Sequence, residues 1–178
     1  ALWQDNLRRL FAYSSIANAG YMLIGVAAAF ASMDAGEAGA LNGIGATIFF
    51  LAIYSVATIG VFATLTWLGS RERQVEHMDD LAGVGSTHPF AGIMMAVFLF
   101  SLAGIPPLAG FWGKFEVFLA ALGVDADTAA AGSSVRSWFL MLAVVGVINA
   151  AIAAAYYLRI ISVMYFRSPL TSPKAEGG

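Results

Sequence analysis

Residues 90–123 of this chain read FAGIMMAVFLFSLAGIPPLAGFWGKFEVFLAALG, an apolar run that contains two adjacent prolines and two charged side chains. A membrane-spanning helix needs about 20 predominantly apolar residues, so the run is long enough to cross a bilayer. Proline cannot donate to the hydrogen-bond ladder of a helix, so Gly104-Ile-Pro-Pro107 must interrupt it. We therefore predict a discontinuous helix, broken near residues 104–113.

Two arrangements of this run are open at first: a hairpin of two half-spans, or one span with a break in its middle. Each half has about 16 residues, below the ~17–25 that a full crossing takes. With one broken span, the basic residues near the start of the chain, after residue 68 and in the tail all lie on one side, as the positive-inside rule expects. The hairpin would put the basic tail on the opposite side, so we predict one broken span.

Three further apolar runs flank this one: Leu10–Met33, Leu41–Leu68 and Trp138–Phe166. The first two contain no charge, the third contains only Arg159, and seventeen of the twenty charged residues lie outside the four runs. We predict an all-α, polytopic membrane protein with four transmembrane helices, the third discontinuous, and with both ends cytoplasmic. The chain forms a single membrane domain over 1–178, with a polar loop at 69–89 and a mobile tail at 168–178.

The composition excludes several classes of protein. The chain is 60% hydrophobic and 11% charged, with a mean hydropathy of +0.78, whereas soluble domains carry about 25% charged residues. The absence of cysteine excludes disulfides and cysteine-ligated iron–sulfur clusters, and a net charge of −2 without a basic run argues against nucleic acid. His77 and His88 lack the ligand spacing of a closed zinc site, and Gly43-Ile-Gly45 lacks the third glycine of a dinucleotide fingerprint. We expect no metal or cofactor on this chain.

Lys114 is the candidate functional residue. It lies nine residues before Gly123, which is about 14 Å of helix and close to the middle of a ~30 Å hydrocarbon core. An ammonium group at that depth is costly, and a broken helix beside an ionisable side chain is typical of ion sites in transporters. The alternative is a structural lysine paired with a buried carboxylate. The residues that form the predicted break are Gly104, Pro106, Pro107, Gly110 and Gly113.

Polar side chains recur at helical spacing on one face of the other three predicted spans. They are Ser14, Asn18 and Tyr21 in the first span, Thr47, Tyr54 and Thr58 in the second, and Asn149 and Tyr156 in the fourth. Such stripes line a hydrated path toward Lys114 or make ordinary interhelical hydrogen bonds, and both readings are open.

Besides Lys114, the four apolar runs contain two charged residues, Glu116 and Arg159. Glu116 lies two positions after Lys114 and therefore points away from it in a regular helix, so it either pairs with another chain or tunes the site. Arg159 lies close enough to the end of its span to reach the interface, and we interpret it as an anchor.

Three motifs carry a resemblance to a known family. They are LRRLFAYSSIANAGY at residues 7–21, SLAGIPPLAGFWGK at 101–114 and YYLRI at 156–160. In this order they resemble the antiporter-like subunits of proton-pumping NADH:quinone oxidoreductase (respiratory complex I), and their amino-acid sequences are most similar to subunit N. Asn18 stands where members of the family often have histidine, and Glu116 stands where subunit N often has an uncharged residue.

The resemblance implies a fold and a function. The chain would be half of an antiporter-like inverted-repeat module, with Lys114 as the proton relay and Tyr54 and Thr58 along a hydrated axis. NADH, flavin, iron–sulfur clusters and quinone would lie on other subunits, and the partners would be neighbouring membrane subunits and lipid, in a bacterial inner membrane. The alternatives are a subunit of a cation/proton antiporter or membrane-bound hydrogenase, and a membrane scaffold that transports nothing.

Overall fold

A computed structural model describes residues 2–33, 37–69, 75–124 and 133–168 of the chain. Its long helices are α1 (Leu7–Ala31), α2 (Glu37–Leu68), α4 (Pro89–Ala103), α5 (Ala109–Leu122) and α6 (Ser133–Phe166). Two single-turn elements precede α4, the 3₁₀ helix η2 (Met78–Leu81) and α3 (Val84–Thr87). Within the described ranges no strand forms, and the one β-type contact is an isolated bridge between Asn6 and His77. The predicted all-α class is confirmed.

Among the described residues, three helices are long and apolar enough to cross a membrane. These segments are Leu7–Ala31, Asn42–Leu68 and Val135–Phe166. Large apolar side chains on their outer faces are exposed, for example Ile16 at 70%, Ile59 at 68% and Trp138 at 62%. A water-soluble bundle would bury such side chains, whereas lipid tails solvate them.

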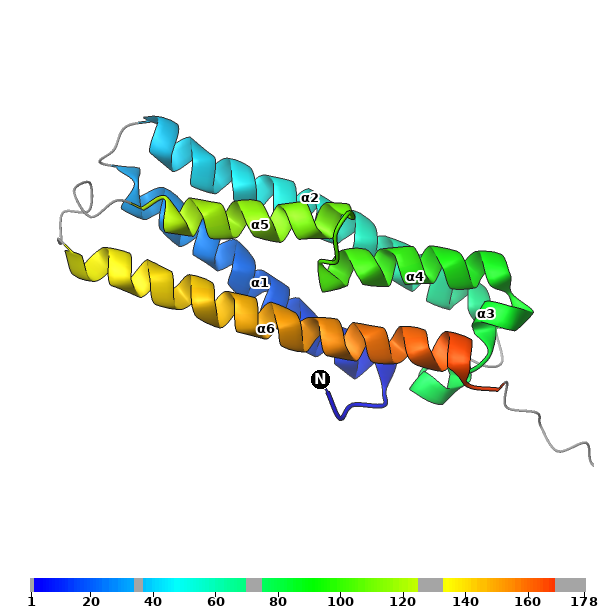
Figure 1. The fold of residues 1–178 in the computed structure, drawn as a ribbon. Helices are drawn as coiled ribbons and strands as arrows, with labels where there is room; N and C mark the ends of the chain where they lie inside the picture. Colours follow the sequence, from blue (N-terminus) through cyan, green and yellow to red (C-terminus); the bar gives the residue numbers. More distant parts are fainter. Residues whose placement is uncertain (1, 34–36, 70–74, 125–132, 169–178) are drawn as a thin grey trace, which may run out of the picture.

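Helices α4 and α5 together make the discontinuous element. Figure 1 shows them following each other along the bundle beside α2, with α5 continuing in the direction in which α4 ends, so they do not form a hairpin. The break occupies residues 104–108, which is shorter than the predicted 104–113, because Gly104 and the two prolines are enough to stop the helix. Gly110 and Gly113, predicted within the break, lie inside α5, where they serve close packing.

Contacts between small residues bring the helices together. A side chain at Gly43 of α2 would lie 2.6 Å from the backbone nitrogen of Ala29 in α1, and one at Gly60 of α2 would lie 2.4 Å from the ring of Phe98 in α4. Close approach of this kind drives helix association in membranes, where the hydrophobic effect between helices is absent.

The end of the bundle that carries η2 is tied together by main-chain bonds and ion pairs. Leu7 N–H donates to the Glu76 carbonyl at 2.8 Å, and Met78 N–H donates to the Asp5 carbonyl at 2.9 Å. Arg159 of α6 pairs with Asp5 at 2.7 Å, which agrees with an anchoring role for this arginine. Residues 70–74 of the predicted polar loop and 169–178 of the predicted mobile tail lie outside the described residues.

Candidate functional site

The break leaves two main-chain carbonyls of α4 without helical donors. Gly104 ends the helix with φ 80°, a left-handed conformation that suits glycine, and its N–H donates to the carbonyls of Phe100 and Ser101. In a continuing helix the carbonyls of residues 102 and 103 would accept from the N–H groups of residues 106 and 107. Both of those positions are proline, which has no N–H. The two carbonyls are therefore available to another donor.

Lys114 is that donor. Its Nζ donates to the Leu102 carbonyl at 2.7 Å and to the Ala103 carbonyl at 3.3 Å. The side chain is only 5% exposed, and Nζ also lies 5.4 Å from the centre of the Tyr21 ring on α1, within the range of a cation–π contact. Among the described residues no carboxylate forms an ion pair with Lys114. The ammonium is thus held by carbonyl dipoles and an aromatic face. This arrangement favours the interpretation of Lys114 as part of an ion site over that of a structural lysine paired with a buried carboxylate.

Gly110 positions the start of α5 so that Lys114 can reach the end of α4. A Cβ atom at Gly110 would lie 1.7 Å from the Ser101 carbonyl oxygen, so no larger residue fits this contact. The Gly110 N–H donates to the Ser101 hydroxyl at 3.2 Å. Gly113 makes a similar close contact with Phe50 of α2, where a Cβ would meet the ring at 2.8 Å. These contacts fix the first two turns of α5, and Lys114 lies in the second of them.

A cavity of about 370 Å³ lies beside the lysine, between the break, α5 and α6. Lys114 and Gly104 line it from the break side, and Val147, Ala150 and Ala154 line it from α6. The cavity is large enough for several water molecules, each of which takes up about 30 Å³ of liquid volume. Its walls are largely apolar, so Lys114 is the charged group that faces it.

Hydrogen bonds connect residues of the predicted polar stripes to one another and to neighbouring side chains. The Ser14 and Tyr157 hydroxyls share a hydrogen bond between α1 and α6, and the Asn18 amide donates to the Ser14 carbonyl at 2.9 Å. The Asn149 amide donates to the Tyr21 hydroxyl at 3.1 Å. The ring of Tyr21, whose hydroxyl Asn149 contacts, is the ring over which Lys114 lies.

The second helix contributes two hydroxyls with different surroundings. Tyr54 donates to the Ser15 hydroxyl at 3.1 Å. The hydroxyl of Thr58 is buried without a hydrogen-bond partner in the described part of the chain, and so is that of Tyr156 in α6. Thr47 donates to the Gly43 carbonyl within its own helix at 2.8 Å. The predicted polar residues therefore include some that form hydrogen bonds between helices and some whose hydroxyls have no partner among the described residues.

Sequence reasoning missed three contacts of this site. A proline lacks the N–H that the helix ladder needs, so the sequence indicates that carbonyls one turn earlier are free, but not that Lys114 donates to those of Leu102 and Ala103. Tyr157 was overlooked in favour of Tyr156, because adjacent residues on a helix point in different directions and spacing alone did not decide between them. The contact of Lys114 with the Tyr21 ring depends on how α1 packs against α5.

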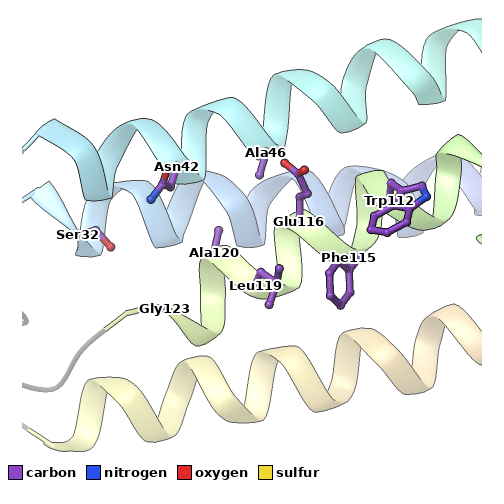
Figure 2. Close-up of a pocket in the computed structure, with 9 residues that line it drawn as sticks. All are labelled: Ser32, Asn42, Ala46, Trp112, Phe115, Glu116, Leu119, Ala120 and Gly123. Atoms are coloured by element: carbon purple, nitrogen blue, oxygen red, sulfur yellow. The ribbon is translucent and has the colours of Figure 1, made fainter.

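Glu116 lies apart from Lys114. It does not line the cavity beside the lysine, and it borders a second hollow between α2 and α5. Figure 2 shows its carboxylate directed toward α2, near Ala46, with Asn42 further along the same helix. The sequence prediction that this side chain points away from Lys114 agrees with the geometry.

The family model and the curated relatives that match this chain all carry the name of NADH:quinone oxidoreductase. Residues 1–140 match the family described as "NADH:quinone oxidoreductase/Mrp antiporter, TM". The chain is 42% identical over 170 residues to NADH-quinone oxidoreductase subunit N of Paramagnetospirillum magneticum, covering 96% of this chain and 30% of the relative. It is 44% identical over 166 residues to the subunit N of Rhodospirillum rubrum, covering 93% of this chain and 29% of the relative. The chain thus spans about 30% of the length of these relatives.

A solved structure shares the fold. A chain of respiratory complex I from Thermus thermophilus with bound aureothin matches with a TM-score of 0.63 and 33% identity, covering 99% of this chain and 34% of that chain. With its bacterial relatives and its long apolar helices, this chain is an integral, multi-pass protein of the bacterial inner membrane. It belongs to the NADH:quinone oxidoreductase/Mrp antiporter transmembrane family, in the branch of the subunit N proteins.

Proposed function

We propose that this chain is part of a proton-translocating membrane subunit of NADH:quinone oxidoreductase, and that Lys114 relays a proton at the helix break. The observation that carries the proposal is the way in which the lysine is held. Its Nζ is buried and bonded to two carbonyls, and no carboxylate among the described residues pairs with it. Neutral dipoles compensate the cost of burying a charge only in part, and a lysine held in this way, without a carboxylate partner, is suited to giving up and taking back a proton.

The proposed driving force is electrostatic. A unit charge that appears about 4 Å away changes the energy of the ammonium by about 4 kcal/mol at an effective dielectric constant of 20. That energy corresponds to a change of about 700-fold in the protonation equilibrium, at about 1.4 kcal/mol for each factor of ten. Quinone reduction elsewhere in the complex would supply the charge, with no redox chemistry and no cofactor on this chain.

The proposed path away from Lys114 uses the polar groups around Tyr21. Hydroxyls and amides both donate and accept, so they can order water or pass a hydrogen bond along. Asn149 contacts the Tyr21 hydroxyl, and Ser14, Asn18, Tyr54 and Thr58 line the same interior. The buried hydroxyl of Thr58, to which no described residue bonds, supports this path, because buried polar groups normally have a partner.

The test is a pair of substitutions at the lysine in the intact complex. Lys114→Arg keeps the positive charge and the donors for the two carbonyls, but a guanidinium is not deprotonated in proteins. Lys114→Met removes the charge and keeps the apolar length. We expect both variants to assemble and both to lose NADH-driven proton uptake into inverted membrane vesicles by at least about tenfold, a change of about 1.4 kcal/mol. Arg159→Lys, at the anchoring position, is the control and should pump normally.

Two results would contradict the proposal. Normal pumping by an assembled Lys114→Arg complex would show that the lysine only holds the break together. A native gel of mildly solubilised membranes gives the second check, since the chain must migrate with the band that stains for NADH dehydrogenase activity. Migration in a large band without that activity would instead indicate an antiporter or hydrogenase assembly.

A further inference from the structure

The hollow beside Glu116 is the strongest feature that the proton relay leaves unexplained. It has a volume of about 320 Å³ and lies between α2 and α5. Asn42 and Ala46 line it from α2, and Trp112, Glu116 and Leu119 line it from α5, as Figure 2 shows. Lys114 is not among its lining residues, and Phe115 is the one residue that borders both this hollow and the cavity beside the lysine.

The carboxylate of Glu116 lies where a membrane protein rarely leaves one uncovered. It precedes Gly123 by seven residues, which is about 10 Å of helix below the end of α5. The side chain is exposed in the hollow, and no hydrogen bond or ion pair to it is formed by the described residues. Carboxylates at such depth pair with another group or face water, because contact with lipid tails is costly. The side chain is too short to reach the headgroups from there, so its compensating group must come to it.

The face of α5 around Glu116 has the form of a helix-packing surface. Trp112, Phe115 and Leu119 are 52%, 41% and 49% exposed, and with Glu116 they recur at intervals of three and four residues along one side of the helix. That spacing is the stripe that a second helix packs against. Small residues at Ala46, Ala120 and Gly123 border the stripe and permit close approach of another backbone.

We infer that the hollow between α2 and α5 is a docking site for a transmembrane helix of a neighbouring membrane subunit, which places a lysine or arginine against Glu116. Charge complementarity selects a basic side chain. The apolar walls of Trp112, Phe115 and Leu119 suit its aliphatic stem, which is long enough to reach the carboxylate from the axis of a neighbouring helix. A lipid headgroup would have to descend about 10 Å from the interface to make the same contact, so a protein helix is the better occupant. The inference stands apart from the role of Lys114, which lies on the other face of α5.

The first experiment identifies the occupant in the intact complex. Leu119, which lines the hollow, is replaced by the photoreactive residue p-benzoylphenylalanine, and native membranes are irradiated. We expect a cross-link to a transmembrane peptide of another subunit that contains a lysine or arginine within about one helical turn, or ~5.4 Å, of the attachment point. The same replacement at Met141, on the exposed face of α6, is the control for lipid-facing positions. A cross-link to lipid alone, to the polypeptide that contains this chain, or to a peptide without a basic residue overturns the inference.

The second experiment tests the charge. Glu116→Lys would place two cations together, and we expect it to lower the amount of chain recovered in the large assembly by at least about tenfold on a native gel, since an uncompensated buried charge is strongly destabilising. Leu122→Lys adds the same charge at the last residue of the same helix, outside the hollow, and should assemble normally. Exchanging the cross-linked basic residue for glutamate should restore assembly of the Glu116→Lys variant. Normal assembly of Glu116→Lys alone, or failure of the charge exchange to restore it, contradicts the inference.

Discussion

Tyr157 combines two contributions that a pair of substitutions can separate. Its side chain is fully buried, and its hydroxyl bonds to that of Ser14 across the interface between α1 and α6. We expect Tyr157→Phe to lower stability by only about 0.6 kcal/mol, the average for such bonds between membrane helices. Tyr157→Ala also removes the ring and should cost about 3–5 kcal/mol. The measurement is the unfolding temperature of the purified complex in detergent, and equal shifts for the two variants would contradict this division.

Residues differ in how far their role could be predicted from the sequence. The depth of Lys114 in the membrane is a prediction made by counting residues to the end of the apolar run, because the rise per residue is fixed in a helix. The separation of Glu116 from Lys114 followed in the same way from helical geometry. The partners of both side chains did not follow, because a partner depends on which helices become neighbours. Tyr21 contacts Lys114 from a helix that is far away in the sequence.

At the scale of one element, the join between α4 and α5 depends on a glycine. Gly110→Ala would place a methyl group 1.7 Å from the Ser101 carbonyl oxygen, so the start of α5 must move away and carry Lys114 with it. We expect this variant to lower the recovered assembly and, in whatever assembles, the NADH-driven proton uptake.

The matched control is Gly45→Ala in α2. A Cβ atom there meets nothing within 4 Å, and alanine favours a helix over glycine by about 1 kcal/mol. This variant should assemble and pump as the parent does. If Gly110→Ala behaves like Gly45→Ala in native gels and in proton-uptake assays, the contact with Ser101 does not position the lysine.

The discontinuous element also shows where sequence reasoning stops. Two adjacent prolines were enough to predict that the helix breaks, because neither can donate to the ladder. The length of the break could not be read from the same segment. Gly110 and Gly113 have the composition of a loop, yet both are helical, since glycine is costly but tolerated in a helix when a neighbour packs against its backbone.

For the whole molecule, the arrangement of helices predicts which parts of the chain face the same side of the membrane. Counting α4 and α5 as one broken span, we propose four crossings, which place both ends of the described chain on the cytoplasmic side. The chain contains no cysteine, so an introduced cysteine is unique within it. We expect Ser168→Cys, after the end of α6, to react with a membrane-impermeant maleimide from the cytoplasmic side.

Met33→Cys, just beyond the end of α1, should react only from the opposite side. Intact cells and inverted vesicles supply the two directions of access, and the two variants serve as controls for each other. Labelling of both cysteines from the same side would contradict the four-crossing arrangement. It would indicate instead that α4 and α5 enter and leave the membrane on the same side.

The ion pairs at the η2 end contribute little to the stability of the whole. Arg159–Asp5, Arg8–Glu76 and Arg167–Asp79 all join exposed or half-exposed side chains, and such pairs are worth about 0–1 kcal/mol each. The main-chain bonds of Leu7 and Met78 hold the same segments without depending on charge. These pairs therefore orient the polar segment, whereas packing of small residues between the helices holds the bundle together.

The bonding of Lys114 to main-chain carbonyls determines what a complete mutational scan of this protein can detect. Every amino acid supplies the same carbonyl, so exchanging Leu102 or Ala103 reports only on how the new side chain fits, never on the acceptor itself. Whether the acceptors stay free depends instead on Pro106 and Pro107, which withhold the competing donors. Chemical replacement of single backbone amides by esters, which are weaker acceptors, would reach atoms that no codon change can alter.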